Sequence, residues 1–372
     1  MSHELPYIAA IDEAIKLEME RDASVLYFGQ NMATTENEDF VKRFGGDRVR
    51  VTPISETAEI GVAVGAALAG MRPVVELYMA EFMLVAMDQV VNEAPRFRAM
   101  TGGQVTVPLV LKAGYGFAAG WAGQHTGTLT NLFMGVPGLK VALPATAADA
   151  KGLMATAIRD DNPVVFLHHY LLTLEHGEVP DGEHLVPFGQ ADIRRPGGDV
   201  TIVATGWMVA RALAAARTLA GEGIEAEVID PRTVSPLDTR TILESVARTG
   251  RLVLVDQAPR HAAAAQAIAG EVAEHGFSSL KAPIVQVSGR DATVPYSQPL
   301  ETYVIPDADR IATAVRGVLG TAPVAVRCRC RPRTHHCGFR TLPAWGQAPV
   351  GSQECRCRPR TRTAVGFRTL PA

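Results

Sequence analysis

Short apolar, β-branched runs alternate with stretches of helical periodicity through the first 168 residues of the chain. Residues 7–21 repeat apolar side chains at helical spacing and predict an amphipathic helix. Six runs of strand length follow, at residues 25–29, 49–52, 73–78, 107–113, 140–144 and 163–168. This alternation predicts a mostly parallel sheet with helices on both faces, and a site where the carboxyl ends of the strands meet.

The same alternation starts again at residue 200. It predicts strands at 200–205, 226–230, 251–256 and 282–287, and helices at 207–221, 238–249 and 261–275. The segment between the two alternations, residues 170–199, is rich in turn residues. We therefore predict an α/β fold with two doubly wound domains, which divides the chain into a first domain at 1–185, a linker at 186–199, a second domain at 200–322 and a tail at 323–372.

One acid, Glu56, precedes an apolar helix that the pattern predicts at 57–70. Ser55 before it is typical of a helix N-cap. Small residues leave room for another element to pack closely against this helix, at Gly61, Gly65 and Gly70. Two roles fit Glu56: an acid in the first helical turn, stabilised by the helix dipole, or a catalytic carboxyl group.

Composition narrows the class of protein. With 372 residues, 47% of them hydrophobic, and a mean hydropathy of +0.08, the chain is long and apolar enough for two buried cores. No apolar run has the length of a membrane span, and the N-terminal helix is acidic, so we expect a soluble cytoplasmic protein. The first 322 residues hold 26 basic and 38 acidic residues, which argues against nucleic-acid binding.

The tail differs in composition from the rest of the chain. Residues 328–344 and 355–372 form an approximate direct repeat rich in Arg, Pro and Cys, without hydrophobic periodicity, so we predict disorder. All the cysteines lie in this tail, at Cys328, Cys330, Cys337, Cys355 and Cys357. A zinc site is suggested by Cys328, Cys330, His335, His336 and Cys337, but the C-x-C spacing is unusual, and we favour a read-through or out-of-frame extension.

The order and spacing of four segments resemble the β subunit of thiamine-diphosphate-dependent 2-oxo acid dehydrogenases, which include the pyruvate, branched-chain and acetoin complexes. The segments are ISETAEIGVAVGAALAGMRPVVE, AMDQVVNEAPRFRAMTGG, AGQHTGTLTNLFMGVPGLKVALP and DAKGLMATAIRDDNPVVF, and the resemblance runs from about residue 5 to residue 320. It implies a pyrimidine-binding domain followed by a domain like the transketolase C-terminal domain. In that family the second domain builds subunit interfaces and carries little chemistry.

The resemblance implies a role for three residues. Glu56 falls on the glutamate that hydrogen-bonds N1′ of the cofactor's pyrimidine and so activates the cofactor, which supplies the electron sink for decarboxylation. Phe82 falls on the aromatic residue that packs on this ring, although an ordinary core phenylalanine fits equally well. His125, in a glycine-rich loop, would assist proton transfer or acylation of the lipoyl group, and the alternative is a structural loop histidine.

The segment ATAIRDDNP resembles a monovalent-cation loop. By resemblance the potassium ligands would be Leu109, Ala157, Ile158, Asp160 and Asn162. Oxygen ligands suit such an ion, but an Asp and an Asn before Pro163 also form an ordinary turn.

The family holds the cofactor's diphosphate and magnesium with a GDG motif, and this sequence contains none. An α subunit would therefore supply them in an α₂β₂ assembly, which passes the acyl group to a lipoyl acyltransferase (E2). Two alternatives stay open: a split transketolase-like or acyloin-type carboligase subunit, and a non-catalytic assembly subunit.

The chain departs from the family pattern at several positions. Gln30 and Asn31 stand where the family usually carries acids, which puts coupling between the two active sites in doubt. Lys112 replaces a common arginine, and His168 replaces a common acid. The segment APRHAAAAQAIAGEVAE lacks a familiar glycine-rich turn. Because none of these changes touches Glu56, we expect a divergent member rather than an inactive one.

Overall fold

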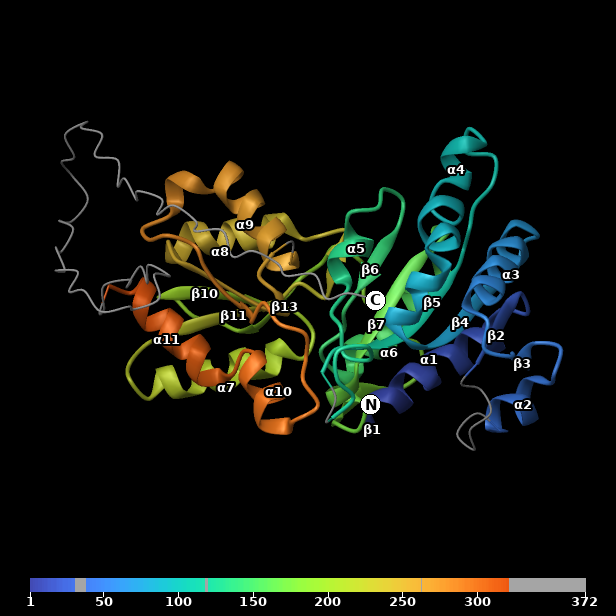
Figure 1. Cartoon of the computed structure of the whole chain (residues 1–372), viewed down its shortest axis with the longest axis horizontal. Coiled ribbons are helices and arrows are strands. Elements are labelled where there is room, and N and C mark those ends of the chain that lie inside the picture. Colours follow the sequence, from blue (N-terminus) through green and yellow to red (C-terminus); the bar gives the residue numbers. More distant parts are fainter. Residues whose placement is uncertain (31–37, 118–119, 262, 321–372) are drawn as a thin grey trace, which may run out of the picture. The chain divides into compact units, whose positions relative to one another are not determined.

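The computed structural model describes residues 1–30, 38–117, 120–261 and 263–320. Its first sheet has seven strands in the order β12-β6-β7-β5-β4-β2-β3 (Figure 1). The strands are β2 (Val25–Gly29), β3 (Val49–Val51), β4 (Arg72–Met79), β5 (Val110–Tyr115), β6 (Lys140–Ala142), β7 (Val164–His169) and β12 (Thr233–Ser235). All pairs are parallel except β12 with β6, which confirms the predicted mostly parallel sheet.

Helices cover both faces of this sheet. On one face α1 (Tyr7–Arg21) and α6 (Ala147–Arg159) bury their apolar sides against alternate residues of β2, β4, β5 and β7. On the other face α3 (Glu56–Leu68) and the short helices η2 (Ala80–Ala86), η3 (Asp88–Glu93) and α5 (Thr130–Met134) bury theirs. Two further short helices, α2 (Glu38–Phe44) and α4 (Phe97–Met100), complete this part of the chain.

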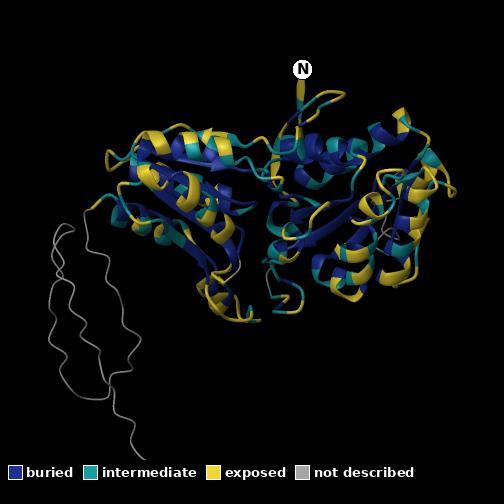
Figure 2. Ribbon diagram, turned by 90° about the horizontal axis from the view of Figure 1, so that it is seen from above, coloured by how far each residue is buried: buried dark blue, intermediate teal, exposed yellow. Residues whose placement is uncertain are grey.

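The second sheet has five strands in the order β14-β13-β10-β11-β9. They are β9 (Asp192–Arg195), β10 (Val200–Ala204), β11 (Ala226–Asp230), β13 (Leu252–Pro259) and β14 (Val285–Gly289), of which only β9 pairs antiparallel. The helices are α7 (Met208–Ala220), α8 (Thr239–Thr249), α9 (Ala264–His275), η5 (Phe277–Ser279), α10 (Gln298–Val304) and α11 (Ala308–Val318). Both sheets are buried and the helices expose one side to solvent, as the colours of Figure 2 show.

Three features differ from the sequence prediction. β5 begins at Val110 rather than at residue 107, because the Val107 N–H bonds the Asp161 carbonyl outside the strand ladder. Residues 170–199 are not only loop: they contain η4 (Tyr170–Leu172), β8 and β9, and β8 (His176–Pro180) pairs with β1 (Ser2–Pro6). β12 lies within residues 200–322, the predicted second domain, yet it pairs with β6 of the first sheet. The first sheet therefore takes one strand from beyond the predicted boundary.

The tail at residues 323–372, which we predict to be disordered, lies outside the described residues, and so does Asn31. Among the helices that the structure describes, none combines the length and the apolar character needed to cross a lipid bilayer.

Candidate functional site

Glu56 lies at the carboxyl end of the first sheet, as predicted, and is the first residue of α3. Its side chain is buried, with 8% exposed. Gln30, directly after β2, donates a hydrogen bond from Nε2 to Glu56 Oε1 at 3.3 Å. The first departure from the family pattern therefore touches the predicted key acid, contrary to our expectation that none did.

Phe82 and His125 contact each other. Phe82 lies in η2, His125 in the loop between β5 and α5, and their ring centroids are 5.6 Å apart with the rings at 82°. The hydroxyl group of Thr57 in α3 donates to the carbonyl of Val85 in η2 at 3.1 Å, so the start of α3 and the helix with Phe82 are joined. The structure thus brings the three predicted residues onto adjoining elements at one end of the sheet.

Two acids near this site, the buried Glu59 and the half-buried Glu81, were missed by the sequence reasoning. Glu59 accepts a hydrogen bond from Thr52 Oγ1 at 2.7 Å, and burial raises its pKa. Glu81 accepts a bond from the Gly127 N–H, and burial raises its pKa as well. Within the described residues the Oε2 atom of each acid is buried without a hydrogen-bond partner. The spacing of Glu59 one turn after Glu56, and the position of Glu81 beside Phe82, were the available signals.

Lys112 and His168, the two other departures, belong to a buried polar row across β2, β4, β5 and β7. Lys112 forms an ion pair with Glu76, and the Tyr27 hydroxyl group donates to Glu76 Oε2 at 2.7 Å. His168 is buried, and burial followed by the nearby Lys112 charge holds its pKa well below the usual value. A neutral imidazole at residue 168 is compatible with this row because Glu76 already balances the Lys112 charge.

The predicted potassium ligands gather around the end of α6, where basic side chains already contact three of them. Arg72 donates to the carbonyl oxygens of Ile158 and Asp160, at 3.1 and 3.2 Å. The Asp160 carboxylate pairs with Lys140. Asn162 donates to Asp160 Oδ1, and its own Oδ1 accepts from Arg98 at 3.0 Å. The other two residues lie nearby: Ala157 O accepts from Asp160 N, and Leu109 O accepts from Val164 N.

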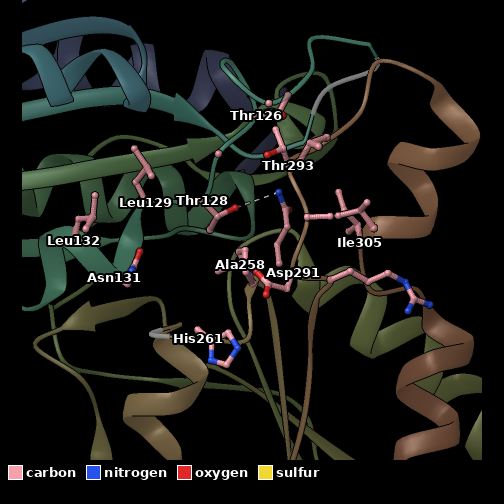
Figure 3. A pocket seen from close by; sticks show the side chains of 18 residues that line it. Thr126, Thr128, Leu129, Asn131, Leu132, Ala258, His261, Asp291, Thr293 and Ile305 are labelled. Atoms are coloured by element: carbon pink, nitrogen blue, oxygen red, sulfur yellow. Dashed lines mark hydrogen bonds between the residues drawn. The ribbon is translucent and has the colours of Figure 1, made fainter. Parts of the chain in front are cut away.

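A pocket of about 620 Å³ opens beside the His125 loop. Figure 3 shows it with Thr126, Thr128 and Asn131 on one side and His261 and Asp291 on the other. One pocket is therefore lined by residues from the parts of the chain that form the first and the second sheet. A second pocket, lined in part by Tyr78, Trp121, His125 and Tyr296, adjoins it at Gly123 and Thr293.

Comparison with known families defines the class of protein first. Residues 3–173 match the family described as "Transketolase, pyrimidine binding domain", and residues 189–311 match "Transketolase, C-terminal domain". A solved structure titled "Split gene transketolase, inactive beta4 tetramer" shares the fold, with a TM-score of 0.72 and 22% identity over 84% of this chain and 97% of that one. The chain is therefore a two-domain protein of the transketolase type.

Curated relatives define the family more closely. "Acetoin:2,6-dichlorophenolindophenol oxidoreductase subunit beta" of Cupriavidus necator is 47% identical, over 85% of this chain and 98% of the relative. "Pyruvate dehydrogenase E1 component subunit beta" of Rickettsia conorii is 43% identical over 83% and 96%, and "2-oxoisovalerate dehydrogenase subunit beta" of Bacillus subtilis is 37% identical over 84% and 98%. The chain belongs to the family of E1 β subunits of 2-oxo acid dehydrogenases.

Proposed function

We propose that the chain is the β subunit of a thiamine-diphosphate-dependent E1 enzyme that decarboxylates a 2-oxo acid and passes the acyl group to a lipoyl domain. The observation that carries this proposal is the buried Glu56 at the start of α3, on elements that adjoin the contacting rings of Phe82 and His125. The match to the pyrimidine-binding family over residues 3–173 supports it.

The residues present fit the pyrimidine half of the cofactor. When bound, thiamine diphosphate supplies the electron sink that decarboxylation of a 2-oxo acid needs. Glu56 would hold a proton at pyrimidine N1′, and Gln30 orients its carboxyl group by donating a hydrogen bond to Oε1. Phe82 would pack on the ring, which is a contact that aromatic side chains favour. His125 would move a proton during acyl transfer, because an imidazole exchanges protons near neutral pH.

The diphosphate and its magnesium ion are assigned to an α subunit. The sequence has no GDG motif, and no group of three or more His, Cys, Asp or Glu residues suited to a metal occurs in the described residues. We therefore propose an α₂β₂ assembly with shared active sites. We also propose an E2 acyltransferase as partner and a cytoplasmic location.

The potassium site stays part of this proposal. A carbonyl oxygen has two lone pairs, so Ile158 and Asp160 can accept from Arg72 and also contact an ion. The test is thermal unfolding in KCl and NaCl at equal ionic strength. We expect a higher Tm in KCl for the wild type and no difference between the salts for Asn162→Ala. Equal Tm values for the wild type in both salts would contradict the site.

A second substrate class deserves the same assay. The relatives from Cupriavidus necator and Bacillus subtilis, at 47% and 40% identity, are named acetoin:2,6-dichlorophenolindophenol oxidoreductase subunits. An acyloin would be split between its carbonyl carbon and its carbinol carbon: the carbinol half would leave as an aldehyde, and the acyl half would be oxidised by the electron acceptor. This candidate belongs with the main family resemblance, which includes the acetoin complexes, and not with the non-oxidative carboligase alternative.

One experiment separates these functions. The chain is co-expressed with an α-type partner, and turnover of pyruvate, branched 2-oxo acids and acetoin is measured with dichlorophenolindophenol, with and without thiamine diphosphate and magnesium. Cofactor-dependent turnover of a 2-oxo acid supports the main proposal, and turnover of acetoin alone supports the second. A stable complex without turnover of any of them would contradict both and leave the assembly role.

A further inference from the structure

The loop that carries His125, residues 120–129, has few hydrogen bonds of its own. Ala122 has a left-handed backbone with φ 57°, and its carbonyl accepts from the His125 N–H at 3.3 Å and from the Thr126 hydroxyl group. These bonds form one tight turn around the histidine. The first sheet's part of the chain also holds the loop: the Gly127 N–H donates to Glu81, the Gly127 carbonyl accepts from the Gly116 N–H, and the Trp121 ring contacts the rings of Tyr78 and Tyr170. These contacts leave the Gly120 N–H and the Thr128 hydroxyl group to partners from elsewhere in the chain.

Glu301 of α10, in the second sheet's region, holds the start of the loop. Its Oε2 accepts a hydrogen bond from the Gly120 N–H at 3.2 Å, across 181 positions of sequence. The residue is fully buried, and its other oxygen, Oε1, has no hydrogen-bond partner among the residues that the structure describes. Burial of the Oε1 atom of Glu301 without a hydrogen-bond partner lowers the stability of the fold. The fold keeps Glu301 in this place, and with it the bond from Gly120, despite that cost.

Gln257, in β13, holds the end of the loop. Its Nε2 donates to Thr128 Oγ1 at 3.4 Å, a bond drawn as the dashed line in Figure 3. Its Oε1 accepts from His169 Nε2 at 2.6 Å. The Leu171 N–H donates to His169 Nδ1, so the proton of this neutral ring lies on Nε2 and the direction of the bond to Gln257 is fixed. Gln257 therefore bridges β7 and the loop.

The middle of the loop also contacts the second region. A Cβ atom added at Gly123 would collide with Cγ2 of Thr293, so only glycine permits this approach. Thr293 lies beside the loop in the pocket of Figure 3. The loop is thus in contact with the second region at its start, its middle and its end.

We propose that Glu301 and Gln257 are positioning residues that clamp the His125 loop, so that the second domain sets the place of the imidazole together with Glu81 and Phe82 of the first. The role of His125 itself rests on the proposed function. The clamp also extends what the family resemblance implied, because it gives the second domain a part in the active site beyond subunit contacts.

Hydrogen exchange of the full chain without any partner tests the clamp itself. In Glu301→Leu the peptide spanning residues 120–129 should exchange about 10-fold faster than in the wild type, while β10 and β11 keep their protection. Glu301→Gln retains an oxygen that accepts from Gly120 and should restore wild-type exchange. Thr302→Ala, an exposed position on the same helix, is the matched control. Gln257→Met provides a second variant, with faster exchange expected at Thr128, if Glu301→Leu does not fold.

Activity of the complex with its α partner tests the positioning role. Acyl transfer to a lipoyl domain should fall about 10- to 100-fold in kcat for Glu301→Leu, because small displacements of a catalytic group are costly. The KM for the 2-oxo acid should stay within about two-fold, and Glu301→Gln should recover most of the kcat. Partial unfolding would also lower the apparent kcat at constant KM, so decarboxylation with dichlorophenolindophenol is measured in the same preparation. Loss of folded complex lowers both rates equally, whereas displacement of His125 lowers acyl transfer more.

The outcomes separate the clamp from the proposed function. Unchanged exchange of residues 120–129 in both Glu301→Leu and Gln257→Met overturns the clamp, whatever the enzyme does. Faster exchange with unchanged acyl transfer overturns the positioning role. A wild-type complex without cofactor-dependent turnover overturns the proposed function, and the exchange result then decides on the clamp alone.

Discussion

The start of α3 and the His125 loop are built in different ways. Glu56 is placed by the helix that begins with it, by the strand end shortly before it and by Gln30 after a neighbouring strand, all within the first 70 residues. The His125 loop is held at Gly127 by Glu81 and Gly116 of the first sheet's part of the chain. It is also held at its start by Glu301 and at its end by Gln257, more than 120 positions away in sequence. The start of α3 is placed by contacts that are close in sequence. The His125 loop depends also on packing between the parts of the chain that form the two sheets. Substitutions in each region should therefore fail in different ways.

The largest effect is expected at Glu56. Glu56→Gln should lower kcat of the reconstituted complex by about 100- to 10,000-fold, because the amide cannot hold the proton at the pyrimidine nitrogen. Its Tm should change little, since only the favourable dipole contact is weakened. Steady-state turnover and thermal unfolding measure the two effects. Glu59→Gln, one turn later on the same helix, is the control, and an equal loss of turnover in that variant would contradict a specific role for Glu56.

A large loss of stability is expected when Lys112 is replaced. Lys112→Met leaves the buried Glu76 carboxylate without its cation, which should cost about 3–5 kcal/mol in the free energy of unfolding. Urea unfolding measures this cost. Lys112→Arg keeps the charge and should cost much less. If Lys112→Met were as stable as the wild type, the polar row would not depend on this pair.

His125 should affect one step more than another. His125→Ala should lower acyl transfer to a lipoyl domain about 100-fold, because the proton-transfer group is lost. Decarboxylation followed with dichlorophenolindophenol should fall much less. Parallel assays of the same preparation give the ratio of the two rates. Equal losses in both assays would assign His125 to the decarboxylation step or to structure instead.

The smallest effect concerns pH. Burial lowers the pKa of His169 from 6.5 to about 4, so the native state keeps this ring neutral while the unfolded chain takes up a proton below pH 6.5. Stability from this group is complete above pH 6.5 and falls as the pH drops towards 4, by at most about 1.4 kcal/mol per pH unit. Urea unfolding of wild type and His169→Asn at pH 7 and pH 5 measures the difference. Equal pH dependence in both proteins would contradict it.

The sequence was sufficient where the relevant contacts are local. The helix at residues 7–21 and the strands at 25–29 and 226–230 are found with the predicted bounds, because periodicity and flanking turn residues define them. The parallel sheet and the position of Glu56 at its carboxyl end follow from the same alternation. Phe82 and His125 came from family resemblance, and the structure adds that their rings touch.

The sequence was insufficient where partners are distant. No local pattern pairs β1 with β8, or β12 with β6, because such pairs depend on how distant segments meet. The hydrogen bond from Gly120 to Glu301 could not be predicted from the sequence for the same reason. The departure at Gln30 was thought remote from Glu56, and only the structure shows that the two side chains touch.

The most direct test of the central claim follows the proton that Glu56 is proposed to control. NMR measures the rate at which thiamine diphosphate, bound to the assembled complex, exchanges its C2 proton for deuterium, in the wild type and in Glu56→Gln. We predict an exchange rate at least about 100-fold lower in the variant, with the cofactor still bound. Equal exchange rates in the two proteins would contradict the proposal that Glu56 activates the cofactor.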